Sequence, residues 1–272
     1  MEEECRLGAA ILSFGEKTWA RHRRPATIYT LGAGAGTLAR ALARLSDGRL
    51  RTLNCSPTAG NRACFFARRG SDDAHFYHGP FFDLDDERYE TEETLQPFRD
   101  GYDVLFEDTT FQMYGRDRDK QTGFIAPRIR SGGVLVQVQK LTHRNADAYL
   151  ERERQKDEVF KSRFFTTKQI VEKKRGVLDT MFDFQVDLVT SQSALRSYFR
   201  YAVVTWNSGN FYTIVSSNSL DSLRDFVTSM VEPAIPPEFC YERLPHALVS
   251  DQNDPIPPDW EWRLPRSMGG EA

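Results

Sequence analysis

The sequence predicts an α/β fold: a doubly wound, mostly parallel seven-stranded sheet with a terminal antiparallel hairpin strand. Three observations predict it. Apolar runs of strand length alternate with helical patterns as far as residue 140, a glycine-rich turn follows the first of these runs, and two β-rich runs near the end flank an Asn–Gly turn. Alternating strands and helices are typical of a parallel sheet covered by helices on both faces. A chain of 272 residues can bury a sizeable core in one such sheet.

The first half of the chain carries five of the expected strands. Apolar side chains at helical spacing predict an opening helix over residues 3–20, which Pro25 stops. The strands are short, apolar and bounded by turn residues, and we place them at 27–31, 50–54, 75–78, 102–108 and 134–139. Between them we expect helices from the glycine turn to Leu45, from Pro57 to Arg68, within 83–101 and over 119–130.

Residues 143–176 break this alternation. They are rich in Arg, Lys and Glu and show no strand pattern, so we expect one or two exposed helices, with a helix start at 166–170. A charge run of this kind is usually a solvated face. A lid over a binding site and an anion-binding surface are the alternatives.

The chain ends with a hairpin, a helix and a proline-rich tail. Residues 201–206 and 211–216 flank an Asn–Ser–Gly–Asn turn, whose Asn and Gly residues tolerate positive φ angles, and this predicts the hairpin. A helix over 219–231 follows. From Pro233 to Pro265 we expect an irregular strap, or a tail that is partly disordered past Pro255.

Composition excludes several classes of protein. A net charge of −3 and a pI of about 6.0 give no footprint for nucleic-acid binding. No apolar run is long enough to span a membrane, and the acidic N-terminus does not resemble a secretory signal. Four scattered cysteines form no zinc pattern, so we expect thiols in a reducing compartment, a cytoplasmic location and no metal.

The glycine-rich turn carries the strongest functional signal. Gly32, Gly34 and Gly36 lie between a predicted strand and a predicted helix. Glycines there allow a tight turn and a close approach of the backbone to a ligand, and the helix start points free N–H groups at it. A dinucleotide fingerprint needs its third glycine where Thr37 stands, and the Gly-Lys-Ser/Thr ending of a phosphate-binding loop is absent.

Over residues 26–140 the chain resembles the class I, Rossmann-like S-adenosylmethionine-dependent methyltransferases, whose first motif is a strand followed by such a glycine trio. The resemblance implies that S-adenosyl-L-methionine is the cofactor and that Gly32, Gly34 and Gly36 receive it. It also implies one domain over 1–272, with a cofactor half at 26–140 and a substrate or lid half at 141–272.

The resemblance suggests further cofactor contacts. In that family an acid after the second strand bonds the ribose; here Asn54 stands at that place, with Ser56 beside it. After the third strand, Asp83 fits the acid beside the adenine amine, and Phe82 is available to pack on the ring. An exposed acid in an acidic loop is the alternative for Asp83.

Polar side chains gather after the fourth strand. Glu107 and Asp108 point to opposite faces if the strand persists, so only one enters a pocket at the strand end. We favour Asp108, either as the base for a substrate amine or as the holder of the cofactor's amino group. Glu107 is a second cofactor candidate, and caps for the following loop are the alternative for both acids. The candidate partners around them are Thr109 and Gln112 for substrate and Tyr114 for catalysis.

Two residues of the second half complete the candidate site. Trp206 borders the hairpin and could line a substrate pocket or stabilise a sulfonium by cation–π contact; cross-strand packing is the competing role. His143, just after the fifth strand, is a conceivable base, although a lone histidine is more often a surface residue.

These observations leave three functions open. The first is a methyltransferase of specialised metabolism that acts on a small molecule, with no nucleic-acid or membrane partner and a possible homodimer. The second uses the same cofactor to transfer or cyclise its aminobutyrate or aminopropyl arm, because residues 103–110 are similar to the acidic motif of aminopropyltransferases. The third is a non-catalytic module that binds the cofactor or a partner.

Overall fold

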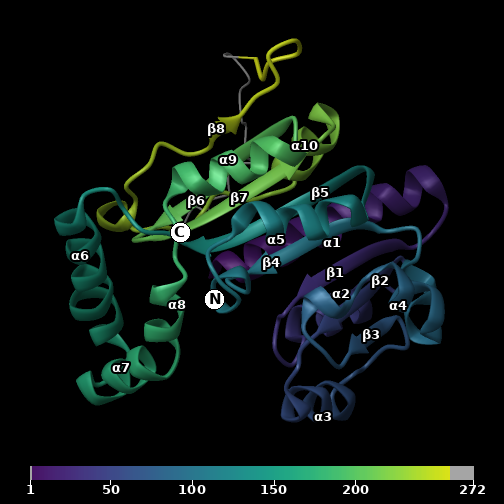
Figure 1. Cartoon of the computed structure of the whole chain (residues 1–272), viewed down its shortest axis with the longest axis horizontal. Coiled ribbons are helices and arrows are strands. Elements are labelled where there is room, and N and C mark those ends of the chain that lie inside the picture. The colour runs from purple at the N-terminus through teal and green to yellow at the C-terminus, as the bar shows by residue number, and fades with distance from the viewer. Residues whose placement is uncertain (1, 258–272) are drawn as a thin grey trace, which may run out of the picture.

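The computed structural model describes residues 2–257, with the side chains at 177, 178 and 180 excepted. Eight strands form a single sheet in the order β3-β2-β1-β4-β5-β7-β6-β8, with helices on both of its faces (Figure 1). This confirms the α/β fold and corrects the expected number of strands from seven to eight. The order departs from the 3-2-1-4-5-6 order of dinucleotide-binding sheets, because β7 is inserted between β5 and β6.

The first five strands are parallel. They are β1 (Ala26–Leu31), β2 (Leu50–Cys55), β3 (Ala74–Tyr77), β4 (Tyr102–Asp108) and β5 (Ile129–Lys140). All six residues of β1 are buried, as expected for a central strand covered on both faces. The carboxyl ends of these strands therefore meet at one edge of the sheet, which we call the carboxyl edge.

The last three strands extend the same sheet. β6 (Tyr201–Ser208) and β7 (Phe211–Ser217) form the predicted hairpin, and β7 runs antiparallel to β5. β8 (His246–Val249) then pairs antiparallel with β6. This strand lies inside the proline-rich tail, where an irregular strap was expected; the part of the tail beyond residue 257 lies outside the described residues.

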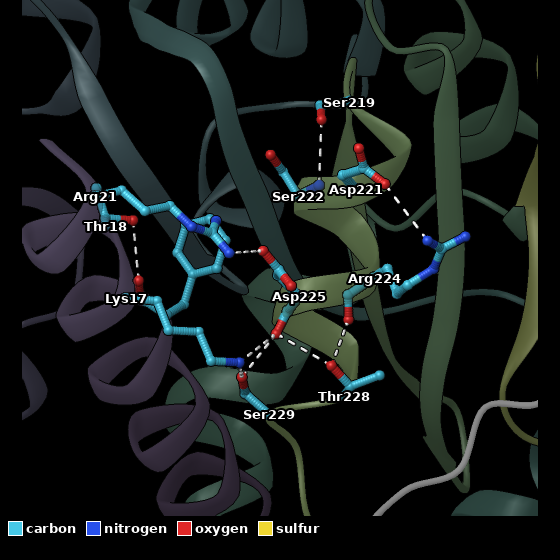
Figure 2. A network of polar contacts seen from close by, with 11 residues as sticks. Lys17, Thr18, Arg21, Ser219, Asp221, Ser222, Arg224, Asp225, Thr228 and Ser229 are labelled. Atoms are coloured by element: carbon cyan, nitrogen blue, oxygen red, sulfur yellow. Dashed lines mark hydrogen bonds and ion pairs between the residues drawn. The ribbon is translucent and has the colours of Figure 1, made fainter.

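Three helices cover one face of the sheet: α1 (Glu2–His22), α2 (Thr37–Leu45) and α10 (Leu220–Val227). The first and last of these pack together, with Phe14 and Phe226 in edge-to-face contact. Figure 2 shows the polar network at their border: Arg21 donates to Asp225 over 2.6 Å, and Lys17 donates to Ser229 over 2.8 Å. The N-terminal helix is thereby joined to α10 across the same face.

The opposite face is covered by α4 (Asp86–Thr91), α5 (Arg118–Ile125) and α9 (Leu188–Tyr198), whose buried side chains belong to a second apolar cluster. The sequence pattern of residues 177–200 did not predict α9, because this helix mixes polar and apolar residues. Asp187 caps the helix by accepting a hydrogen bond from the Thr190 N–H. The helix expected over 119–130 ends at Ile125, since β5 already begins at Ile129. A short helix, α3 (Ala59–Ala67), follows β2 and packs its Phe65 against Phe76 of the edge strand β3.

The charged segment forms an arm that projects from the sheet (Figure 1). It contains α6 (Ala146–Arg154), α7 (Thr167–Lys173) and α8 (Asp179–Asp183), with π-helical turns at Gln155–Phe160 and Lys174–Leu178. Thr166 caps α7 in a capping box with Gln169, which confirms the predicted helix start. We call residues 146–183 the arm.

None of the helices described combines the length and the apolar content needed to cross a bilayer.

Candidate functional site

The glycine turn between β1 and α2 adopts the backbone that its composition predicts. Gly32, Gly34 and Gly36 have φ angles of +64°, +56° and +64°, in the left-handed region that side chains disfavour. A Cβ on Gly32 would lie 2.4 Å from Thr110, and one on Gly36 would lie 2.8 Å from Phe65. A Cβ on Gly34 would meet only Asn61, at 3.9 Å, so the middle glycine faces open space.

Buried side chains of β2 hold this turn in place. Asn54 is fully buried; its amide donates to the Gly34 carbonyl over 3.0 Å, and its Oδ1 accepts from Thr30 over 2.8 Å. The next residue, Cys55, accepts hydrogen bonds at Sγ from the Gly32 amide and the Tyr29 hydroxyl. Burial raises the pKa of this thiol to about 11, so it stays neutral. Both groups of Asn54 are thus committed to the chain itself.

Ser56 shapes the turn that follows β2. It is almost fully buried, and its hydroxyl accepts from the Asn61 amide over 2.9 Å and from the Thr58 N–H over 3.3 Å. Asn61 therefore brings its side chain to the open side of the glycine turn. Its importance was not visible in the sequence, since it lies within a helix that shows no motif.

The two adjacent acids at the end of β4 point to opposite faces. Glu107 is fully buried on the face of α5 and α9, where its carboxylate accepts from the Phe111 N–H over 3.0 Å and from Gln139 over 3.3 Å. Burial raises the pKa of Glu107 to about 7. Its bonds fix the start of the loop after β4, so this carboxylate is occupied within the protein.

Asp108 occupies the other face, at the carboxyl edge and near Glu4 of α1. Burial, together with the charge of Glu4, raises the pKa of Asp108 to about 6, while the Thr109 hydroxyl opposes the rise. Its side chain retains partial solvent access. A half-buried carboxylate with this pKa can accept a proton at neutral pH or hold a cationic group. The contribution of Glu4 could not be read from the sequence, because more than 100 residues separate the two acids.

Thr109 carries backbone strain directly beside Asp108. Its φ is +56°, which is rare for a β-branched residue, and its N–H donates to the Val138 carbonyl over 2.8 Å. Strained residues of this kind gather at active sites, where the surrounding structure enforces them. The next residue, Thr110, donates to the Leu31 carbonyl over 2.9 Å and so ties this loop to the glycine turn.

Exposed aromatic side chains border the site on the β3 side. Phe82 and Tyr114 are in edge-to-face contact with ring centroids 5.3 Å apart, and both also contact the buried Phe81. They remain 48% and 39% exposed, which is unusual for rings of this size. Asp83, in the same turn, is exposed. We call Phe82 and Tyr114 the aromatic ledge.

Three further candidates are placed less centrally. Gln112 is fully buried; its amide donates to the Lys140 carbonyl, and its Oε1 has no partner within residues 2–257. Trp206 is half-buried beside a bulge in β6. His143 is half-buried, and its Nδ1 accepts from the Asn145 N–H of its own turn over 3.0 Å. The contacts of His143 are thus local to the turn that leads into α6.

The arm is fastened to the carboxyl edge by a buried ionic cluster. Glu153 of α6 accepts from Lys140, at the end of β5, over 3.0 Å and from Lys156 over 2.5 Å. Asn210, from the hairpin turn, donates to the other oxygen of Glu153 over 2.9 Å. Burial raises the pKa of Glu153, but the charges of Lys156 and Lys140 outweigh it and lower the value to about 2.

No group of three or more His, Cys, Asp or Glu side chains among the described residues is arranged to hold a metal ion. The four cysteines are free thiols.

Comparison with known proteins identifies the fold. No family model and no curated protein matches the sequence. Among solved structures, the plantazolicin methyltransferase BpumL in complex with SAH is similar over 79% of this chain and 85% of its own, with a TM-score of 0.51 and 10% identity. Its complex with SAH and a pentazolic desmethylPZN analog gives a TM-score of 0.51 at 11% identity, over 79% and 86%.

An O-methyltransferase family protein from Burkholderia thailandensis matches with a TM-score of 0.46 and 16% identity, over 72% of this chain. The chain spans about half of that protein, since 52% of the latter is covered. The similarity to BpumL shows that the chain has the fold of this methyltransferase.

Proposed function

We propose that this protein is an S-adenosylmethionine-dependent methyltransferase that acts on a small molecule of specialised metabolism. The observation that carries the proposal is the glycine turn, whose middle glycine faces open space at the carboxyl edge while its flanking glycines are packed. Ligands of open α/β sheets bind outside the carboxyl ends of the strands. The fold shared with BpumL, which was solved with SAH, supports the same cofactor.

The residues at this edge fit the cofactor. No side chain caps the start of α2, so the amides of its first turn are free to face a carboxylate. The aromatic ledge and Asp83 offer a flat apolar surface and an acceptor, which suit adenine. At the other end Asp108 and Glu4 supply the negative charge that an ammonium or sulfonium group requires.

Asn54 and Glu107 take supporting roles in this proposal. The amide of Asn54 already bonds Gly34 and Thr30, so we assign it to positioning the glycine turn rather than to holding ribose. Glu107 is likewise occupied by Phe111 and Gln139, and we assign it to positioning the loop that carries Asp108. Asn61, which lies at the open side of the turn, and Ser56, which accepts from it, are the candidates for the ribose hydroxyls.

The chemistry asked of the protein is modest. S-adenosylmethionine, when bound, supplies an activated methyl group. The protein must then align the acceptor, exclude water and receive the proton that the acceptor loses. Asp108 is the proposed proton acceptor, because its raised pKa makes it a better base than an ordinary aspartate. Thr109, Gln112 and Trp206 are proposed to line the acceptor site, and His143 is the second candidate for the base. Tyr114 is assigned to the aromatic ledge.

Isothermal titration calorimetry with S-adenosylmethionine and S-adenosylhomocysteine tests the proposal first. NADH and ATP are the negative controls and should not bind. Gly34→Val should abolish binding, because its side chain would fill the open space. Gly60→Ala is the matched control, since a Cβ there meets nothing within 4 Å. Absence of binding by the folded wild-type protein would contradict the proposal.

A pH profile tests the role of Asp108 once an acceptor is found in a small-molecule screen. The value of kcat/KM should fall tenfold per pH unit below about pH 6, where Asp108 becomes protonated. Asp108→Asn should lower kcat/KM about 100-fold or more and remove this dependence. Asp119→Asn, on the exposed surface of α5, should leave the profile unchanged.

A second candidate function rests on the proximity of Asp108 and Glu4. Two carboxylates at the acceptor end favour a cationic acceptor, as transfer of an aminopropyl arm to a polyamine would need. The products separate the two reactions: S-adenosylhomocysteine marks methyl transfer, whereas methylthioadenosine marks transfer or cyclisation of the arm.

A further inference from the structure

The distal part of the arm is strongly basic. Residues 161–175 contain six basic residues and one acidic residue, which gives a net charge of +5 in a chain whose total is −3. Three of the cations, Lys173, Lys174 and Arg175, are exposed, and no acid within residues 2–257 lies at ion-pair distance from them. We call residues 161–175 the basic arm surface.

Aromatic side chains lie among these charges. Phe164 and Phe165 connect the two helical parts of the arm and are 67% and 55% exposed. Neighbouring exposed aromatic rings are costly in water and commonly mark a surface that another molecule covers. The base of the arm is anchored, since Phe160 contacts Phe239 with ring centroids 5.6 Å apart. The basic arm surface is therefore presented outward by a fixed support.

The opposite charge is gathered elsewhere on the same chain. Residues 83–100, around α4, contain eight acidic and two basic residues, a net charge of −6. Glu87, Glu90 and Glu93 are exposed and have no ion-pair partner among the described residues. We call residues 83–100 the acidic segment. It begins directly after Phe82, so the exposed rings of the aromatic ledge border it.

These two surfaces cannot meet within one molecule. In Figure 1, which is drawn with the longest axis horizontal, α7 of the arm lies at one end and α4 at the other. The basic arm surface has excess positive charge beside Phe164 and Phe165, and the acidic segment has excess negative charge beside the aromatic ledge. The two surfaces therefore have complementary charges. Surfaces with complementary potentials and apolar patches are the usual elements of a specific interface.

We propose that two copies of this chain form a reciprocal dimer, in which the basic arm surface of each copy docks on the acidic segment of the other. In a dimer with a two-fold axis, the arm of each copy contacts the acidic segment of the other, so every favourable contact occurs twice in the interface. Phe164 and Phe165 then lie beside the aromatic ledge of the second copy. The arm of one copy would thereby close the site of the other at its ledge end. The inference stands on charge and exposure and does not depend on the proposed reaction.

Charge reversal with complementation tests the dimer. Light scattering and sedimentation equilibrium should show a wild-type dimer at low salt that weakens as salt rises. Lys173→Glu/Lys174→Glu/Arg175→Glu and Glu87→Lys/Glu90→Lys/Glu93→Lys should each be monomeric, because like charges then face each other. An equimolar mixture of the two variants should form a heterodimer, since both reciprocal contacts are again complementary.

The controls separate this outcome from unfolding and from a general effect of charge. Lys120→Glu/Arg196→Glu/Arg243→Glu changes the net charge by the same amount at exposed sites outside the arm, and this variant should remain dimeric. Circular dichroism verifies that each variant is folded. A monomeric wild type at 100 µM in low salt, or two folded variants that do not combine on mixing, would overturn the proposal. Association of the wild type with anionic vesicles instead of itself would also overturn it.

Discussion

The side-chain amide of Asn54 donates to the carbonyl oxygen of Gly34 over 3.0 Å, so a fully buried residue of β2 holds the middle of the glycine turn. The same side chain packs under Gly36, where an added Cβ would lie 3.0 Å from its Cγ. The side chain for which the sequence predicted a ribose contact is therefore bonded within the chain and braces the turn. The shape of the turn depends on an uncharged donor at that position.

Asn54→Asp should destabilise the protein and weaken cofactor binding together. The substitution replaces the donor with a carboxylate that faces the Gly34 carbonyl, so a buried hydrogen bond becomes a repulsion. We expect a loss of about 1–3 kcal/mol in the free energy of unfolding, measured by urea denaturation. Asn253→Asp, at an exposed position, should change it by less than about 0.5 kcal/mol. If Asn54→Asp is as stable as the wild type, Asn54 does not brace the glycine turn.

The three glycines should separate binding from stability. Gly36→Ala places its Cβ 2.8 Å from Phe65 and should lower the melting temperature strongly, as should Gly32→Ala, whose Cβ meets Thr110 at 2.4 Å. Gly34→Ala has open space and should cost only the backbone strain of about 1–2 kcal/mol. The main effect of Gly34→Ala should instead be a lower affinity for S-adenosylmethionine, measured by titration calorimetry. Equal melting temperatures for the three variants would contradict this division.

Local patterns predicted much of the fold. The strand at Leu50–Cys55 and the capped start at Thr166 follow from short-range signals of burial and capping, and the structure has both. The strand β8 could not be predicted in this way. Its four residues follow a proline-rich stretch, and the partner that makes them a strand, β6, is about 40 residues away in the sequence.

The candidate site shows the same limit. Sequence spacing placed Asp108 at the carboxyl edge, because it is the last residue of a strand that ends there. The commitments of Asn54 and Glu107 to buried partners, and the nearness of Glu4 to Asp108, depend on tertiary contacts that no local pattern encodes. Residue type and strand position thus predict which side chains reach the edge, whereas burial decides which of them remain available.

Glu107 should make stability depend on pH in a defined direction. Burial raises its pKa from 4.5 to about 7 in the folded state, so the folded protein binds this proton more tightly than the unfolded chain does. Stability should therefore fall as pH rises from about 4.5 to about 7 and level off above, by about 3 kcal/mol in all. Glu107→Gln removes the buried charge and keeps an acceptor for the Phe111 amide.

Urea denaturation at a series of pH values checks this. The variant should gain stability relative to the wild type above pH 7, and the gain should vanish near pH 4.5. Glu90→Gln, on the exposed surface of α4, should show no such trend. A Glu107→Gln difference that is constant across this range would show that the carboxyl does not titrate as proposed.

The Glu153 carboxylate should be the most sensitive point in the attachment of the arm. It lies between the buried ammonium group of Lys140 and the partly buried one of Lys156, so Glu153→Gln leaves two neighbouring cations without their counter-charge. Removing one member of a buried ionic group costs about 3–5 kcal/mol, and we expect that loss in urea denaturation at pH 7. Because the folded pKa of Glu153 is lowered to about 2, its stabilisation is complete above pH 4.5 and is lost as pH falls toward 2.

Replacing the pair Lys140 and Glu153 by Met and Leu distinguishes lost charge balance from lost packing. The double variant removes one charge of each sign and fills the same space with apolar groups, but it leaves Lys156 with only Asp157, at 4.0 Å, as a counter-charge. It should therefore recover part of the stability that Glu153→Gln loses. Hydrogen exchange of the α6 amides should follow the same order, fast in the single variant and slow in the double one. If the double variant is as unstable as the single one, hydrogen bonding by Glu153, including the bond from Asn210, outweighs its charge.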